Sequence, residues 1–386
     1  MIQETSREQI GKFKLASEVK FEPISAIEVG IDQYLAPKSI YAVAIKDPYI
    51  EFFPGEVLQE IRSMELDASN FAMSRRLDGA WERKPRTAYV DDQETSHKKR
   101  SWGDPVSQTR FFGHLNSPSL DAWRAKIPSA ASLADLSDTL SYPIILDKEG
   151  NSVPVDETTR RWLSLCTDAA AIRGRSSIMA EIVRVIIENG SPRDEYNWLS
   201  IACGTALPAM QGSIRAGIRP NLFLADFDNS ALELTASIAK EIGFQGTINR
   251  PSKEALGKDT VNIFNEKDMN TLVEYLATIG KSPTLIDLMG IFEYTGGSLG
   301  VDSVGFLKNC FNMLQPGGKL IFGQMRSDRP VTDFLTGVVC WPYIEMRSPR
   351  DFMDIIYRAG ISPLDTSIYL PDDGVYTIGV ITKRSA

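Results

Sequence analysis

The chain has 386 residues, 43% of them hydrophobic, which is enough to bury a large core and predicts two domains. Lys and Arg total 42 against 50 Asp and Glu, so the net charge is −8 and an obligate nucleic-acid partner is not expected. The 4 cysteines show no paired metal spacing and no disulfide framework, and 2 histidines are too few for a His-rich metal site. No signal stretch or long apolar span is present, which predicts a cytoplasmic protein without a membrane span.

Residues 1–155 carry much charge and turn chemistry, and we expect a mainly helical and irregular N-terminal region. Pro37, Pro48 and Pro54 interrupt its early apolar segments, and an amphipathic helix is predicted from Glu56 to Ile61. Helical spacing also predicts a helix over residues 119–140. The charged, aromatic-containing stretch 68–118 is either an ordered loop over the other half of the chain or a substrate lid. The region as a whole is predicted to cover the substrate.

The segment 156–190 has the strongest helical pattern before residue 196. Its apolar residues recur at helical spacing on both sides of Gly174, and Asn189 with Gly190 forms a stop signal. The sequence Arg173-Gly174-Arg175 interrupts the pattern and predicts a junction between two helices. The two arginines are either solvated or carboxylate-paired at that junction, or they approach a ligand.

The sequence from Trp198 to Pro208 begins as an apolar run and ends in a turn of small residues around Gly204. A buried parallel strand has this pattern where it leads into a crossover helix, and small residues let a ligand touch the backbone. About twenty residues later, a second apolar run ends in Asp226, the spacing of a carboxylate that binds ribose hydroxyls. Further strands are predicted at 261–264, 284–288 and 318–323, with a helix at 229–242. This alternation predicts an open, doubly wound α/β sheet.

Three segments within residues 196–383 resemble the class I S-adenosylmethionine-dependent methyltransferase family. They are the turn Ala202-Cys203-Gly204-Thr205-Ala206, the sequence Asp226-Phe227-Asp228, and the helix and turn from Phe306 to Gly318. The resemblance implies a Rossmann-like fold with a mostly parallel seven-stranded sheet, closed by strands at 366–370 and 375–382. It divides the chain into 1–155 and 156–386, the latter with leading helices at 156–190 and a methyltransferase core at 196–386. Ala206 departs from the family, which has a third glycine with easy access to positive φ at that position.

The resemblance implies S-adenosylmethionine as the cofactor. Gly204 and its neighbours would bring the backbone close to the amino acid portion, and Arg173 would pair with its carboxylate. Asp226 would hold the ribose hydroxyls, with Asp228 either as a fallback or as a helix cap. Asp268, which is otherwise a solvated turn residue, would accept the adenine amino group. The predicted cofactor residues are Ala202, Cys203, Gly204, Asp226, Phe227, Asp268, Met269, Leu288, Met289 and Arg173.

The loop after the predicted fourth strand contains Gly290 and a later glycine pair, which favours a backbone that bends close to a ligand. Glu293 and Tyr294 in this loop are the predicted catalytic residues, because the family places acceptor-facing residues there. They would orient an acceptor hydroxyl or take its proton. Alternatively, Phe292 and Tyr294 anchor the loop in the core.

These features predict an enzyme that transfers a methyl group from S-adenosylmethionine to a small-molecule acceptor, with oxygen as the favoured acceptor atom. One alternative is a non-catalytic, methyltransferase-like binding or regulatory protein. Another is an NAD(P)-binding oxidoreductase, which is disfavoured because the Gly-x-Gly-x-x-Gly pattern is absent. The acceptor and the oligomeric state do not follow from the sequence.

Overall fold

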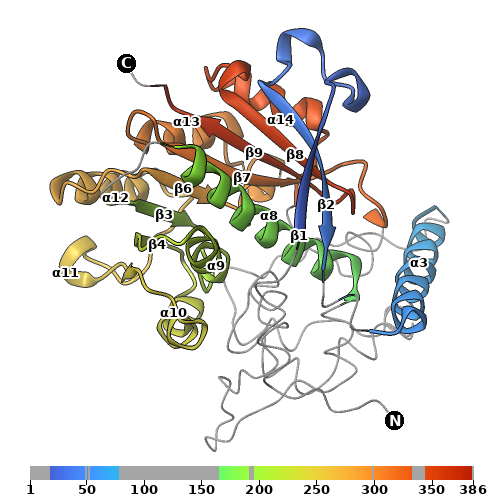
Figure 1. Cartoon of the computed structure of the whole chain (residues 1–386), viewed down its shortest axis with the longest axis horizontal. Coiled ribbons are helices and arrows are strands. Elements are labelled where there is room, and N and C mark those ends of the chain that lie inside the picture. Colours follow the sequence, from blue (N-terminus) through green and yellow to red (C-terminus); the bar gives the residue numbers. More distant parts are fainter. Residues whose placement is uncertain are drawn as a thin grey trace, which may run out of the picture. The chain divides into compact units, whose positions relative to one another are not determined.

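Figure 1 shows the computed structural model of the chain, in which residues 18–47, 50, 53–77, 165–190, 195–297, 300–332 and 344–384 are described. The chain divides into two compact units. The larger unit comprises Glu18–Lys46, Gly174–Asp328 and Glu345–Ala386. The smaller unit comprises Met1–Ser17, Asp47–Arg173 and Arg329–Ile344.

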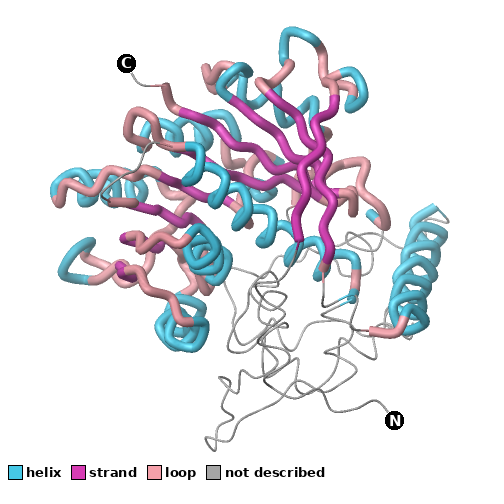
Figure 2. Tube along the Cα trace, viewed as in Figure 1, coloured by secondary structure: helices cyan, strands magenta, loops and turns pink. Residues whose placement is uncertain are grey.

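A nine-stranded sheet forms the centre of the larger unit and is traced in magenta in Figure 2. Its strands are β1 (Glu18–Ile24), β2 (Ser39–Lys46), β3 (Asn197–Ile201), β4 (Asn221–Ala225), β5 (Thr247–Asn249), β6 (Leu285–Leu288), β7 (Lys319–Met325), β8 (Thr366–Pro371) and β9 (Tyr376–Thr382). They lie in the order β1-β2-β8-β9-β7-β6-β3-β4-β5. Every residue of β3 and β6 is buried, as expected for parallel strands covered on both faces.

Helices alternate with these strands along the chain. The α-helices of this part are α8 (Thr167–Asn189), α9 (Leu207–Ala216), α10 (Asn229–Ile242), α11 (Lys253–Leu256), α12 (Glu266–Thr278), α13 (Ser303–Met313) and α14 (Pro349–Arg358). Short 3-10 helices are η1 (Ile27–Val29), η2 (Gln33–Leu35), η4 (Phe292–Tyr294) and η7 (Pro363–Asp365). The doubly wound α/β architecture predicted from the sequence is therefore present.

The sheet differs from the predicted seven-stranded, mostly parallel one, because it has nine strands and mixed directions. β5, β4, β3, β6 and β7 run parallel to one another, but β9 lies antiparallel between β7 and β8, which gives the reversed final hairpin implied by the resemblance. β1 and β2 form a further hairpin, and β2 pairs in parallel with β8. Residues 18–46 thus belong to the sheet, which differs from the predicted boundary at residue 155. Pro37 precedes β2 and lies outside it.

The strand predicted at 261–264 is wrong. These residues form a loop, and the third parallel strand is instead β5, which has three residues at the sheet edge. Val261 and Ile263 are fully buried although they pair with no strand, so their apolar character reflects packing of the loop. The main-chain N–H of Val261 donates to the carbonyl of Asp226 at 2.9 Å, which ties this loop to the end of β4.

The helix junction predicted at Gly174 is also wrong, because α8 runs without interruption from Thr167 to Asn189. Gly174 has a packing role: a Cβ at this position would lie 2.9 Å from Cδ1 of Ile45 in β2. Gly212 of α9 has a similar role, because its Cβ would lie 3.0 Å from Cη2 of Trp198 in β3. Glycine therefore marks places where α8 and α9 pack closely against side chains of β2 and β3.

The connections around β3 create a topological switch point. The chain leaves β3 toward β4 and β5, and then returns to form β6 on the other side of β3. In open α/β sheets, ligands bind outside the carboxyl ends of strands at such a point, because the connecting loops diverge there. The ends of β3, β4 and β6 are accordingly where a site is expected.

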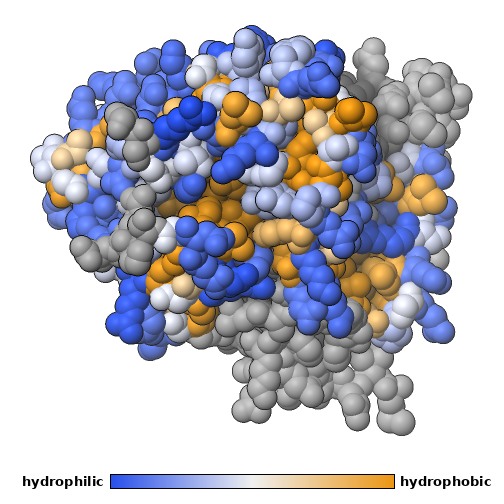
Figure 3. Space-filling model, turned by 45° about the horizontal axis from the view of Figure 1, so that its top comes forward, coloured by the Kyte–Doolittle hydropathy of each residue, from blue (hydrophilic) through white to orange (hydrophobic). Residues whose placement is uncertain are grey.

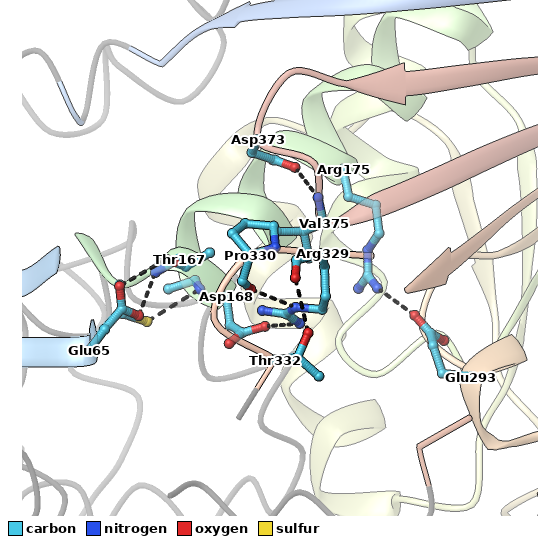
Figure 4. A network of polar contacts seen from close by, with 12 residues as sticks. Glu65, Thr167, Asp168, Arg175, Glu293, Arg329, Pro330, Thr332, Asp373 and Val375 are labelled. Carbon is cyan, nitrogen blue, oxygen red and sulfur yellow. Dashed lines mark hydrogen bonds and ion pairs between the residues drawn. The ribbon is translucent and has the colours of Figure 1, made fainter. Parts of the chain in front are cut away.

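The smaller unit contains α3 (Gly55–Leu77), which includes and extends the helix predicted from Glu56 to Ile61. Figure 4 shows Glu65 of α3 receiving hydrogen bonds from the main-chain N–H and the hydroxyl of Thr167, both at 2.8 Å. Arg329 forms an ion pair with Asp168 at 2.7 Å. Burial raises the pKa of Glu65 to about 7. Residues 68–77 of the stretch 68–118, predicted as a loop or lid, belong instead to α3; the rest of that stretch and the helix predicted at 119–140 lie outside the described residues.

Several large apolar side chains are exposed in the described part of the chain. They include Ile27, Tyr34, Tyr357 and Leu364, and Phe227 at the end of β4 is 56% exposed. Figure 3 shows hydrophobic side chains gathered between hydrophilic ones on one face. None of the helices within the described residues has the length and apolar character needed to cross a membrane.

Candidate functional site

The turn after β3 has an unusual backbone. Ala202, Gly204 and Ala206 all have positive φ, at 53°, 52° and 57°. The left-handed conformation costs an alanine about 1–2 kcal/mol, so two of these three residues are strained. From the sequence, Ala206 is the one residue of this turn expected to disfavour a positive φ. The structure shows that Ala206 nevertheless adopts the glycine-like conformation. Such strain persists only where the surroundings enforce it, and it concentrates at functional sites.

The helix α9 begins directly after this turn. Its N-cap is Ala206, which has no polar side chain to accept from the first amides of the helix, and Pro208 lies in the first turn. The first amides of a helix have no partner inside the helix and carry the positive end of its dipole. The end of β3 therefore presents main-chain donors to any ligand with oxygen atoms.

Asp226 lies beside this turn. The main-chain N–H of Gly204 donates to Oδ2 of Asp226 at 2.7 Å, and the N–H of Asp228 donates to Oδ1 at 2.9 Å. The carboxylate is thus oriented by main-chain donors from the segments that follow β3 and β4. Burial raises the pKa of Asp226 to about 6, although these donors act in the opposite direction. Each oxygen keeps a further lone pair for a ligand donor.

Phe227 and Asp228 follow Asp226 with different roles. Phe227 presents an aromatic ring that is 56% exposed, next to the buried carboxylate. Asp228 accepts from the main-chain N–H of Ala231 at 3.2 Å, which corresponds to the helix-capping alternative for α10.

The predicted adenine residues are engaged within the protein. Asp268 lies in the first turn of α12, where its carboxylate forms an ion pair with Lys258 and accepts from the N–H of Asn262 at 3.0 Å. The hydrogen bond from Lys258 lowers the pKa of Asp268. Met269 and Leu288 belong to the hydrophobic core, and Met289 is also buried.

A second polar group lies at the ends of β6 and β7. Asp287 is buried in β6 and accepts from Nε1 of Trp198 at 2.7 Å and from the hydroxyl of Ser200. Burial raises the pKa of Asp287 to about 6, and the charge of Arg175 opposes this effect. Because Asp287 is paired with Ser200 in register, it lies immediately before the turn that contains Gly204.

Arg175 comes from α8 and reaches the loop after β6. Figure 4 shows its guanidinium directed at Glu293, with Nη1 at 3.6 Å from Oε1. The guanidinium carbon lies 4.8 Å from the ring centre of Tyr376. Glu293 is 2% exposed, and burial raises its pKa to about 7. Arg173, by contrast, forms an ion pair with Asp47 at 2.9 Å within the smaller unit.

The main chain around Glu293 is held in place by Arg347. This buried guanidinium donates to the carbonyls of Phe292 and Thr295, to the hydroxyl of Ser303 and to Oε1 of Gln324. The N–H of Glu345 also donates to the carbonyl of Glu293 at 2.8 Å. Phe292 is fully buried against Phe322 and Phe352, which corresponds to the anchoring alternative for that residue. Tyr294 is partly buried and packs against the same core.

Cys203 lies close to both polar groups. Burial raises the pKa of its thiol well above the ordinary value, and the negative charges of Asp226 and Asp287 act in the same direction. Both carboxyls are therefore close enough to influence one turn residue. The raised pKa keeps the thiol protonated, so Cys203 is a packing residue and not a nucleophile.

Arg173 is the arginine favoured from the sequence, but Arg175 is the one that lies beside Glu293. A signal was available, because Ile172, Arg175, Met179 and Ile182 share the helical spacing of buried positions in α8. Arg347 had no such signal, since its four partners come from distant parts of the chain.

No protein-family model matches this sequence, and no curated protein matches it. The solved structures that resemble the chain include methyltransferases. An O-methyltransferase family protein from Burkholderia thailandensis is 15% identical with a TM-score of 0.37, and the match covers 58% of this chain and 60% of that one. Magnesium protoporphyrin IX methyltransferase from Synechocystis PCC 6803, solved with bound SAH, is 12% identical with a TM-score of 0.40, covering 70% and 97%. Human N-acetylserotonin methyltransferase, solved in complex with SAM, is 12% identical with a TM-score of 0.38, covering 77% and 72%.

Proposed function

We propose that this chain is an S-adenosylmethionine-dependent methyltransferase that acts on a small-molecule acceptor, with oxygen as the acceptor atom. The observation that carries the proposal is the 2.7 Å contact between the main chain of Gly204 and the carboxylate of Asp226. It brings together a strained small-residue turn, a helix N-terminus and a ribose-binding acid at the switch point of the sheet.

The residues present fit an adenosyl amino acid. An ionised Asp226 can accept from both hydroxyls of a ribose, because each carboxylate oxygen already fixed by a main-chain donor retains a lone pair. The exposed ring of Phe227 is next to it and can cover one face of adenine. The start of α9, whose N-cap Ala206 supplies no side-chain acceptor, offers main-chain donors to an amino acid carboxylate.

When bound, S-adenosylmethionine supplies an electrophilic methyl group on a sulfonium, so the protein chiefly has to align the acceptor with it. The loop after β6 is suited to hold the acceptor. Glu293 and Tyr294 are adjacent in η4, and the contacts of Arg347 fix the main chain on both sides of them. We assign the acceptor position to this loop.

Equilibrium binding tests the proposal directly. S-adenosylmethionine and S-adenosylhomocysteine should bind, and NAD should not. Asp226→Ala should weaken binding at least tenfold, because the ribose loses two acceptors, each worth about 1 kcal/mol or more when charged.

Asp259→Ala is the matched control, because Asp259 is 54% exposed and forms only a surface ion pair with Lys253 at 3.5 Å. Its affinity should equal that of the original chain. Equal affinity for Asp226→Ala would remove the ribose assignment. Binding of S-adenosylmethionine without any methyl transfer would favour the non-catalytic alternative, and binding of NAD would favour the oxidoreductase.

A further inference from the structure

The carboxylate of Glu293 is buried without hydrogen bonds. The residue is 2% exposed, and within the described part of the chain neither Oε1 nor Oε2 has a hydrogen-bond partner. Burying an ionisable group in this way is unfavourable, so such a group is rare unless it serves a ligand or a reaction. Hydrogen bonds from Glu345 and Arg347 fix the main chain at and next to Glu293. The side chain therefore extends from a fixed Cα and still has two oxygen atoms that can accept hydrogen bonds.

Arg175 is fixed next to this carboxylate. Its Nη1 lies 3.6 Å from Oε1 of Glu293, which permits strong charge attraction but no hydrogen bond. Its side chain lies beside Gly290 and Gly323, where a Cβ would be 3.6 Å from Nη2 and 3.4 Å from Cδ, at ordinary van der Waals contact. The ring of Tyr376 supports the guanidinium from β9.

The charges around Glu293 come from several elements. Arg175 of α8 and Arg347, which precedes α14, both favour the ionised carboxylate, and Arg175 has the larger effect. Asp287 of β6 also interacts with the positive charge of Arg175, and Glu345 also interacts with the positive charge of Arg347. Two buried carboxyls therefore adjoin the single guanidinium of Arg175, which leaves no net positive charge to attract an anionic acceptor.

Resting on the methyl transfer proposed above, we propose that the acceptor is a neutral hydroxyl compound, that Glu293 takes its proton, and that Arg175 is the positioning residue that holds a positive charge beside the Glu293 carboxylate. The acceptor O–H bond breaks with its proton moving to the Glu293 carboxylate, an O–CH₃ bond forms, and the C–S bond of the sulfonium breaks with its electron pair left on sulfur. The carboxylate charge and the sulfonium charge are both neutralised. Glu293 later releases the proton to water.

The first test is an infrared titration of the protein without cofactor. A protonated carboxyl gives a carbonyl band, and the band that disappears in the Glu293→Gln variant belongs to Glu293. The midpoint of the titration of this band should lie near pH 7 in the original chain. Arg175→Met should raise that midpoint by about one pH unit or more, and Arg175→Lys should restore most of it. A purely structural Arg175 would leave the midpoint unchanged in both variants.

The second test identifies the acceptor class. The protein is incubated with methyl-labelled S-adenosylmethionine and a small-molecule extract, and the labelled products are treated with alkali or hot hydriodic acid. Label released only by hydriodic acid indicates a methyl ether and supports the proposal. Label released by alkali indicates a methyl ester, and label retained under both treatments indicates N- or C-methylation; either would overturn it. An absence of labelled product would overturn methyl transfer itself, while the infrared midpoints would still decide the role of Arg175.

Discussion

The two halves of the proposed site are built in different ways. At the ends of β3 and β4, most of the hydrogen-bond donors belong to the main chain: the N–H of Gly204 donates to Asp226, and α9 begins at the turn. At the ends of β6 and β7, side chains from separate elements meet, namely Arg175 from α8 and Glu293 from η4, with Arg347 holding the loop.

The difference has a physical basis. Main-chain donors are set by local backbone conformation, so they suit the part of a ligand that never changes. Side chains that are held by charge and burial can instead have their protonation adjusted, which suits proton transfer. We therefore expect variants at the first half to change affinity and variants at the second half to change rate.

The largest expected effect is on the rate of Glu293→Gln. Glutamine keeps the size of the side chain but cannot take a proton, so kcat should fall by roughly 10²–10⁴, the usual contribution of a general base. The dissociation constant of S-adenosylmethionine, measured by calorimetry, should remain within about twofold because Asp226 and Gly204 are intact. A variant that instead loses affinity and keeps kcat would reverse the assignment of the two halves.

The next effect is the pH dependence of cofactor affinity. Asp226 has a pKa of about 6 in the free protein, and ribose donors favour its ionised form and so lower that pKa in the complex. Affinity should therefore be constant above about pH 6 and fall as pH drops below it, approaching tenfold per pH unit. Calorimetry between pH 5 and pH 8 measures this. Asp226→Asn should remove the dependence, and a dependence that persists there would assign it to another group.

The smallest expected effect concerns the strained turn. Ala206→Gly removes the strain of an alanine in the left-handed conformation, which stabilises the folded state by about 1–2 kcal/mol. It also gives the unfolded chain more conformational entropy, which lowers stability by about 0.4–1 kcal/mol. The free energy of unfolding, from denaturant titration, should remain equal or rise slightly. Ala209→Gly is the matched control inside α9 and should lower it by about 1 kcal/mol. Equal losses for the two variants would contradict strain at Ala206.

Local patterns predicted the elements that form the first half of the site. The apolar run before Gly204 and the acid of Asp226 are visible in sequence because strand, turn and acid follow one another within about twenty residues. The same reasoning placed a strand at 261–264, because an apolar run buried as a loop has the same composition as a buried strand. It also read Gly174 as a junction, since a glycine that leaves space for Ile45 looks the same as a glycine that ends a helix.

Local sequence patterns are sufficient to predict the α/β alternation, the turn at Gly204 with the acid at Asp226, and the residue types in the loop after β6. Three features follow only from long-range contacts: residues 18–46 extend the sheet, Arg175 and not Arg173 adjoins Glu293, and the carboxyls of Glu293 and Asp287 are buried with raised pKa values. Strand pairing between residues more than 300 positions apart, and the burial that shifts a pKa, depend on contacts that no local pattern encodes.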